Sequence, residues 1–259
     1  MSESNVVENE LGWVARGRGG RGVLLLHGWM TTGAVWDPLL QGLDLGALGC
    51  VVPDLRGVGL SAAVSGPHDL DTYAADVWRV ARAAGLDRPI LVGHSMGGQL
   101  AQRIAAEHPS AFSGLVLLNP VPASGLPLPP DALALFSSAG GDATKLGTIL
   151  DMACTALTAA DRARLLDVAL SIAPETIRAM LGVWTAGGFT SRLADIRAPT
   201  LVVSTDDPFL PPDLLDATVT SRIEGARREH LPGCGHYPLV ERAADTAVIL
   251  ERFVATLPT

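Results

Sequence analysis

The sequence predicts an α/β protein with a mostly parallel sheet that is covered by helices on both faces and carries a helical cap insertion. Two observations predict this fold. Short apolar runs alternate with helical patterns along most of the 259 residues, and runs without polar alternation are typical of strands buried on both faces. The alternation stops between residues 121 and 189, where only helical patterns occur. We therefore expect residues 1–120 and 190–259 to form one core domain, with residues 121–189 as a helical cap.

The first part of the chain contains strands and helices of the core in alternation. The polar residues 1–10 are expected to be loose or to form a short edge strand. Further strands are predicted at 11–16, 23–26, 50–52, 90–92 and 115–118, and helices at 34–43, 70–84 and 99–108. Asp69 is the expected N-cap of the helix at 70–84, and Gly85 is its expected stop.

The second part begins with the insertion and then returns to the alternating pattern. Prolines are frequent between 120 and 130, and helical segments follow near 131–138, 142–156, 159–171 and 174–186. After them we expect a strand at 200–204, a helix near 211–222, a strand near 228–231 and a last helix at 239–257. Ligands of parallel sheets bind at the carboxyl ends of the strands, so functional residues are expected directly after these strands.

The composition argues against several classes of function. A net charge of −8 and a pI of about 5.2 disfavour nucleic acid or an anionic membrane surface as a partner. Cys50, Cys154 and Cys234 form no CxxC pair, which argues against a disulfide framework and against a zinc site. The first residues lack the basic and apolar regions of a signal peptide, and no apolar run reaches the ~18 residues of a membrane span. We therefore expect a cytoplasmic protein.

The segment Gly93-His94-Ser95-Met96-Gly97-Gly98 is the first candidate for chemistry. It lies between a predicted strand and a predicted helix, and its Gly-x-Ser-x-Gly pattern is typical of a nucleophile elbow. The sharp turn strains the serine backbone and requires small residues two positions away on either side, which Gly93 and Gly97 provide. Without its context the same pattern would fit an ordinary strand–helix turn. In this context it favours Ser95 as a nucleophile above the sheet edge.

A serine nucleophile needs a base within reach and an acid that orients the base. The sequence contains both after Ser95, in the order Ser, Asp, His. Asp206 and Asp207 follow the strand at 200–204, and His236 lies in a glycine-containing loop. Each residue has an ordinary alternative: His236 as a simple loop histidine, and the aspartates as helix caps or turn formers. Their common order on one fold favours a catalytic triad.

An acyl-transfer site also needs hydrogen-bond donors for the oxyanion. The backbone N–H of Met96, directly after the nucleophile, is one candidate. The second is expected in the loop after the strand at 23–26, where Gly28 allows a turn and the backbone N–H of Trp29 can point inward.

These motifs together resemble the α/β-hydrolase superfamily, in particular its small serine esterase-like members. The matching segments are His27-Gly28-Trp29, Asp54-Leu55-Arg56-Gly57-Val58-Gly59-Leu60-Ser61, Gly93-His94-Ser95-Met96-Gly97-Gly98, Asp207-Pro208 and Gly235-His236. In this superfamily the acid usually stands directly before the proline of its loop, so the resemblance points to Asp207 rather than Asp206. Val58 departs from the pattern, because such proteins often have histidine there.

The resemblance implies a hydrolase that attacks an ester or lactone with Ser95, forms an acyl-enzyme and releases it with the help of His236. It implies no metal and no organic cofactor, and a small-molecule ester or lactone as the substrate, while the sequence leaves the oligomeric state open. The same triad also serves C–C hydrolases, lyases and perhydrolases, and some members of the fold act as ligand receptors. The loop at His27 is also similar to that of pimeloyl-carrier-protein methyl esterases, but the predicted cap lacks the basic excess that an acidic carrier would require.

The predicted cap connects a strand end to the next sheet element, so it should lie over the edge that carries Ser95. It is rich in apolar residues, beyond what four short helices need to pack on each other. We therefore expect part of it to line an apolar substrate pocket, with Trp184, Met180 and Phe136 as candidates.

Overall fold

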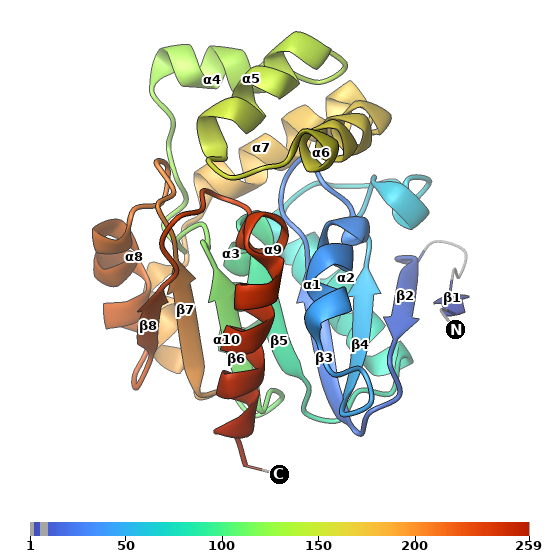
Figure 1. The fold of residues 1–259 in the computed structure, drawn as a ribbon, viewed down its shortest axis with the longest axis vertical. Helices are drawn as coiled ribbons and strands as arrows, with labels where there is room; N and C mark the ends of the chain where they lie inside the picture. Colours follow the sequence, from blue (N-terminus) through green and yellow to red (C-terminus); the bar gives the residue numbers. More distant parts are fainter. Residues whose placement is uncertain (1–2, 6–9, 259) are drawn as a thin grey trace.

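The computed structural model describes residues 3–5 and 10–258, and its centre is a single twisted sheet (Figure 1). The eight strands in these residues lie in the order β1-β2-β4-β3-β5-β6-β7-β8. Strands β1 and β2 are antiparallel to their neighbours, and all other pairs are parallel. The strands are β1 (Glu3–Asn5), β2 (Trp13–Arg16), β3 (Arg21–Leu26), β4 (Leu48–Pro53), β5 (Ile90–His94), β6 (Gly114–Leu118), β7 (Thr200–Ser204) and β8 (Arg227–His230).

Helices cover both faces of this sheet, which confirms the predicted fold class. Helices α1 and α10 pack against each other on one face, and α2 and α3 pack together on the other. Residues 23–26 of β3 and all residues of β5 and β6 are buried, as their apolar runs predicted. The core helices are α1 (Asp37–Gly42), α2 (Leu70–Ala83), α3 (Met96–Glu107), α8 (Pro212–Thr218), α9 (Pro238–Glu241) and α10 (Ala243–Ala255), with 3-10 turns at Gly33–Trp36, Gly59–Ser61, Thr190–Asp195 and Thr220–Arg222.

Several predicted elements differ from the observed ones at their ends. Of the polar residues 1–10, residues 3–5 form β1, whereas residues 1–2 and 6–9 lie outside the described part of the chain. The last predicted helix is two helices, because Arg242 leaves the helical region with φ −135° and ψ 50°. The helix predicted near 211–222 ends at 218, and the one predicted at 34–43 begins with a 3-10 turn. Asp69 caps α2 as expected and accepts a hydrogen bond from the Thr72 amide.

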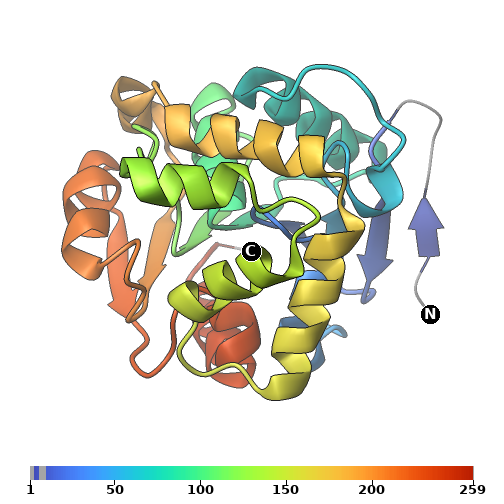
Figure 2. The ribbon, with the colours of Figure 1, turned by 90° about the horizontal axis from the view of Figure 1, so that it is seen from above.

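The insertion between β6 and β7 consists of four helices that lie over the carboxyl ends of the strands (Figures 1 and 2). They are α4 (Pro130–Ser137), α5 (Ala143–Ala153), α6 (Ala159–Ser171) and α7 (Pro174–Ala186). The two ends of the insertion meet at one point, where the Ala123 carbonyl accepts hydrogen bonds from the amides of Gly188 (2.9 Å) and Phe189 (3.2 Å). The chain therefore leaves the core after β6 and returns to it at the same point, and residues 190–199 then lead to the start of β7, which is parallel to β6.

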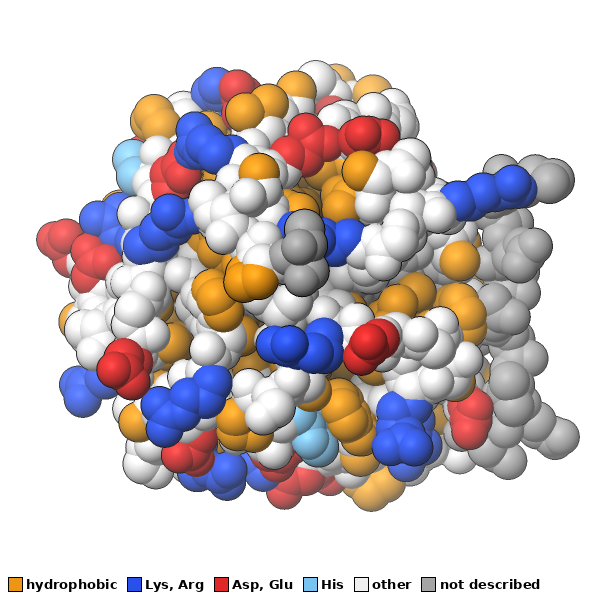
Figure 3. All heavy atoms as spheres, turned by 90° about the horizontal axis from the view of Figure 1, so that it is seen from below, with side chains coloured by type: hydrophobic (Ala, Val, Ile, Leu, Met, Phe, Trp, Pro, Cys, Tyr) orange, Lys and Arg blue, Asp and Glu red, His pale blue; other side chains and the backbone are white. Residues whose placement is uncertain are grey.

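The opposite end of the molecule, at the amino ends of the parallel strands, carries interspersed basic and acidic side chains (Figure 3). It therefore presents no surface of a single charge sign in this view. Within residues 3–5 and 10–258, the helices are too short or too polar to cross a membrane.

Candidate active site

Ser95 lies at the turn between β5 and α3 and has a strained backbone. Its φ of 55° and ψ of −120° are rarely adopted by a residue with a side chain. The turn is tight because a Cβ on Gly93 would lie 2.3 Å from the Gly97 carbonyl oxygen. A Cβ on Gly97 would lie 2.3 Å from the carbonyl oxygen of Leu26, in the neighbouring strand. Both glycines are therefore required by close backbone approach, as the elbow pattern predicted.

Asp207 and His236 are in direct contact at the same edge of the sheet. Asp207 follows β7, is 2% exposed and places its Oδ2 2.6 Å from His236 Nδ1. Its other oxygen accepts a hydrogen bond from the Phe209 amide, which fixes the carboxylate. The carboxylate can only accept, so Nδ1 of His236 carries the proton and Nε2 is left with its lone pair.

The neighbouring carboxylate, Asp206, has different partners. Its Oδ1 lies 3.2 Å from His230 Nε2, and its Oδ2 accepts a hydrogen bond from the Gly233 amide. Of the two aspartates that the sequence placed after this strand, the one that contacts His236 is Asp207.

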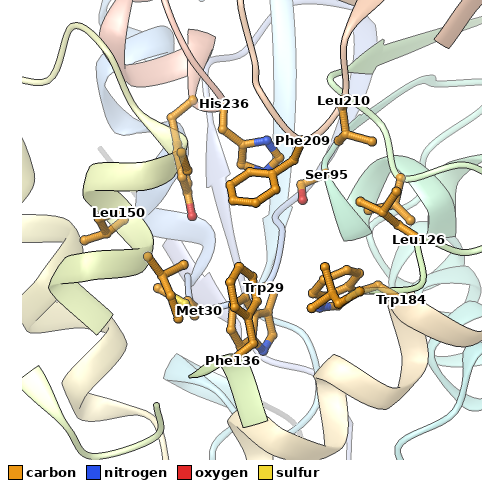
Figure 4. A pocket seen from close by; sticks show the side chains of 15 residues that line it. Trp29, Met30, Ser95, Leu126, Phe136, Leu150, Trp184, Phe209, Leu210 and His236 are labelled. Atoms are coloured by element: carbon orange, nitrogen blue, oxygen red, sulfur yellow. The ribbon is translucent and has the colours of Figure 1, made fainter. Parts of the chain in front are cut away.

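Ser95 and His236 line the same cavity, which has a volume of about 50 Å³. Figure 4 shows both side chains at this space, with Trp29, Phe136 and Trp184 on its other side. Trp29 stacks on Phe136 with ring centroids 5.3 Å apart, and both rings also contact Trp184. The lining is mostly apolar and comprises Trp29, Met30, Ser95, Val121, Leu126, Leu128, Phe136, Ile149, Leu150, Ala153, Trp184, Phe209, Leu210, His236 and Tyr237.

Of the three cap residues predicted to line a pocket, Phe136 and Trp184 do so and Met180 does not. Met180 lies one turn before Trp184 on α7, and its side chain is 0% exposed. Both residues are buried, but only Trp184 is among the residues that line the cavity.

The loop after β3 lies directly against Ser95. A Cβ on Gly28 would be 3.0 Å from the Ser95 Cβ, so only glycine allows this approach without a shift. The backbone amides of Trp29 and Met96 have no acceptor within the described residues, and Met96 is the first residue of α3. Unpaired amides at a helix N-terminus beside a serine are suited to bind an oxyanion.

His27 holds this loop in place, a role that the sequence motif alone did not reveal. Its Nδ1 donates to the Gly28 carbonyl at 2.9 Å, and its Nε2 accepts from the Leu55 amide at 2.9 Å. Complete burial lowers the pKa of this imidazole, despite the nearby Asp54 carboxylate, so the ring stays neutral as these hydrogen bonds require. The indole Nε1 of Trp29 donates to the Ile177 carbonyl at 2.7 Å and links the loop to the cap.

Three further side chains hold the loop that carries His236, and sequence reasoning missed their role. His94 Nε2 donates to the His236 carbonyl at 2.8 Å, and Thr205 Oγ1 donates to the Gly235 carbonyl at 2.6 Å. Asn119 Nδ2 donates to Thr205 Oγ1 at 2.7 Å and lies 3.2 Å from both carbonyl oxygens. All three residues lie at or directly after strand ends, which is the one signal that could have identified them.

The remaining reactive groups do not form a second centre in the described residues. Cys50, Cys154 and Cys234 are free thiols, and burial raises the pKa of Cys50 and of Cys234 to about 12. Within residues 3–5 and 10–258, no group of three or more His, Cys, Asp or Glu side chains could hold a metal ion.

A family model described as the α/β hydrolase family matches residues 23–248. The chain therefore belongs to the α/β hydrolase family, as its sequence motifs and its fold indicate.

Several known proteins are similar to this chain. RutD of Variovorax paradoxus (strain S110), provisionally named a carbamate hydrolase, is 30% identical over 237 residues, which cover 87% of this chain and 88% of RutD. The esterase EaEST of Exiguobacterium antarcticum superposes with a TM-score of 0.88 at 20% identity, over 99% of this chain and all of EaEST. Est816, described as an N-acyl homoserine lactone degrading enzyme, has a TM-score of 0.78 at 25% identity, over 97% of this chain and all of Est816.

The polyketide synthase ThaQ of Burkholderia thailandensis (strain E264) is 33% identical over 234 residues. That match covers 85% of this chain but spans only 11% of ThaQ, so this chain corresponds to a small part of that protein.

Proposed function

We propose that this protein is a serine hydrolase that cleaves a carboxylic ester or lactone through an acyl-enzyme. The observation that carries the proposal is that Ser95 and His236 line one cavity while Asp207 accepts the hydrogen bond from His236 Nδ1. In this proposal Ser95 is the nucleophile, His236 the general base and Asp207 the residue that orients the base. Localisation in the cytoplasm remains part of the same proposal and rests on the sequence alone.

The proposed reaction has two steps. His236 Nε2 takes the proton from Ser95 Oγ as the oxygen attacks the carbonyl carbon, and then returns it to the leaving alkoxide. Asp207 stabilises the imidazolium that forms in between. A water molecule, activated by His236 in the same way, then cleaves the acyl-enzyme and releases the acid. The amides of Trp29 and Met96 would donate to the oxyanion in both steps, supported by the N-terminus of α3.

The cavity supports an ester or lactone over the C–C hydrolase and lyase alternatives that use the same triad. The cap residues that line it are Val121, Leu126, Leu128, Phe136, Ile149, Leu150, Ala153 and Trp184. None of these eight side chains carries a charge, and only the indole of Trp184 has a hydrogen-bonding group, whereas a lyase or C–C hydrolase would need polar groups that stabilise a carbanion. A volume of about 50 Å³ has room for roughly four water-sized groups, which suits a short acyl group.

Hydrolysis of a series of p-nitrophenyl esters from acetate to octanoate, together with a panel of lactones, tests the proposal. We expect kcat/KM to rise over the first members, since each buried CH₂ contributes up to ~0.8 kcal/mol, and to fall once the acyl group exceeds the cavity. The lactones are included because Est816 is described as degrading an N-acyl homoserine lactone.

Ser95→Ala is the control for this experiment. We expect it to fold and to lose several orders of magnitude in turnover, leaving about 10³–10⁴-fold acceleration over water from binding and oxyanion contacts. Near wild-type turnover in a folded Ser95→Ala protein would end the proposal, and a flat profile across the ester series would reject the short apolar acyl pocket.

A further inference from the structure

The loop at residues 235–237, which carries His236 and which we call the histidine loop, is held from two sides by different parts of the molecule. Its carbonyl groups, on Gly235 and His236, accept hydrogen bonds from side chains of the core, as described above. Its amide groups are bound from the other side. The His236 amide donates to the Ala153 carbonyl of the cap at 2.8 Å, and the amides of Gly235 and Tyr237 each donate to the Glu241 carboxylate at 3.0 Å.

The same Glu241 carboxylate binds the cap. Its Oε2 also accepts hydrogen bonds from the amides of Thr155 (2.8 Å) and Ala156 (2.7 Å), in the connection between α5 and α6. One carboxylate therefore receives four backbone N–H groups, two from the cap and two from the histidine loop. Hydrogen bonds to an ionised acceptor are roughly twice as strong as neutral ones, so this is a substantial connection.

Residues 153–156, which we call the cap corner, also pack directly on the histidine loop. A Cβ on Gly235 would lie 2.3 Å from the Ala153 carbonyl oxygen and 2.9 Å from the Cys154 Cα. No side chain separates the two backbones at this point. Figure 1 shows the α5–α6 connection above the loop that precedes α9. The cap and the histidine loop are thus in contact through backbone and through Glu241.

We propose that Glu241 is a positioning residue that makes the cap part of the machinery that holds the catalytic base. This inference rests on the proposed function, because it takes His236 as the catalytic base. The carboxylate joins the cap corner to the histidine loop, so the base is held from both sides only while the cap is seated. A cap that moves away from the sheet removes the Ala153 contact and frees Glu241 from the cap. His236 is then held less firmly, and we expect hydrolysis to be fastest with the closed cap.

Hydrogen exchange measures this connection without any substrate. We expect Glu241→Gln to speed exchange at the amides of the cap corner and of the histidine loop together, because an amide NH₂ cannot accept from the N–H groups that it faces. Thr155→Pro changes the cap alone and removes one donor to Glu241. The preceding Cys154 has φ −111° and ψ 145°, a conformation that proline tolerates in the residue before it.

If Thr155→Pro speeds exchange at Gly235 and Tyr237, the cap stabilises the histidine loop. Unchanged exchange at these amides in both variants overturns the inference, whether or not the protein hydrolyses esters. If the variants show the coupled exchange but the wild-type protein cleaves no ester or lactone, the result counts against the proposed function and not against this inference.

Steady-state kinetics measure how the loss of these hydrogen bonds affects catalysis by His236. We expect Glu241→Gln to lower kcat on a short p-nitrophenyl ester at least 10-fold with KM changed less than about 3-fold, and Thr155→Pro to lower kcat about 3-fold. Glu241→Asp keeps the charge but shortens the reach, and it should be impaired as well. Wild-type kcat in Glu241→Asp would assign the effect to charge and overturn the positioning role.

Glu251→Gln is the matched control, because Glu251 on α10 accepts a hydrogen bond from the Asp44 amide (2.7 Å) away from the histidine loop. It should leave kcat and the exchange of the histidine loop unchanged. An equal loss of kcat in Glu251→Gln would show that the Glu241 effect is a general loss of stability and would overturn the inference.

Discussion

Asp206 and Asp207 are neighbours in the sequence but bind different partners, which allows a matched test of the proposed triad. Asp207→Asn keeps the shape of the side chain but favours the wrong imidazole tautomer of His236. We expect it to lower kcat about 10³–10⁴-fold with little change in KM. Asp206→Asn should stay within about 3-fold of the wild type, because Asp206 contacts His230 and the Gly233 amide instead.

The measurement is steady-state hydrolysis of the best ester of the series, with thermal unfolding to show that both variants fold. A larger loss in Asp206→Asn than in Asp207→Asn would refute the proposed role of Asp207.

At the scale of single residues, the sequence predicts those functional residues that stand within a local sequence pattern. Ser95 is marked by its flanking glycines, and Asp207 by the strand before it and the proline after it. No comparable sequence signal surrounds Asn119 or Glu241. Asn119 acts across 116 and 117 residues of sequence, on backbone carbonyls of the histidine loop. Glu241 binds amides that lie 85 and 86 residues away in the cap. Contacts of a side chain with a distant backbone leave no spacing in the sequence.

The junction between β3, β5 and α3 depends on two glycines, and Gly97 offers the clearest test. We expect Gly97→Ala to destabilise the protein by about 1–3 kcal/mol, because the new methyl group would meet the backbone of Leu26 and His27. The same shift would move the Met96 amide away from the Trp29 amide, so we expect kcat/KM to fall at least about 100-fold. Urea unfolding and ester hydrolysis measure the two effects.

Gly182→Ala is the control for that substitution. Gly182 lies inside α7, and no atom lies within 4 Å of the position of an added Cβ. Alanine there should stabilise the protein by about 0.5–1 kcal/mol and leave kcat/KM within about 2-fold. If Gly97→Ala behaved like Gly182→Ala, the strained elbow would not need its glycine.

The helices of the cap were predicted to within a few residues, whereas the last helix was not. The cap helices follow local signals: Pro130 and Pro174 begin α4 and α7, and Asp142 caps α5. The sequence around Arg242 has no such break signal. The chain leaves the helix there because the Glu241 carboxylate turns back onto the histidine loop, and this tertiary contact outweighs local helix propensity.

For the whole molecule, the two completely buried histidines predict a loss of stability in mild acid. Burial lowers the pKa of both His27 and His94 below the ordinary value of 6.5, and for His94 the nearby His236 adds to the effect. As the pH falls below 6.5, the unfolded chain binds protons that the folded protein does not. The free energy of unfolding should therefore fall by up to about 1.4 kcal/mol per pH unit for each histidine.

Urea unfolding at pH 7.5, 6.5 and 5.5 measures this slope. In His94→Gln, which keeps a donor near the His236 carbonyl but does not titrate, we expect the slope to be smaller by the contribution of one histidine. Identical slopes in the two proteins would show that His94 takes up its proton in the folded state.

The fold class could be predicted for the whole molecule, but the arrangement of the strands could not. Apolar runs and helical alternation indicate a parallel sheet with both faces covered. They do not indicate that β3 lies between β4 and β5, or that β2 pairs with β4. Neighbouring strands recognise each other through backbone hydrogen bonds, which every sequence offers equally, so their order follows from the packing of the complete chain.

The junction at Ala123 has a consequence for how such a protein can change over time. The carbonyl of Ala123, at the start of the insertion, accepts from two backbone amides at its end, so this closure does not depend on the side chains between them. Loop-closure entropy grows slowly with length, by only about 0.6 kcal/mol for each doubling. Apart from the cap corner, which the proposed role of Glu241 requires, residues 124–187 could therefore be lengthened, shortened or exchanged for another segment by recombination while β6 and β7 stay paired. The range of substrates can diverge in this way, without rebuilding the sheet that supports the reacting groups.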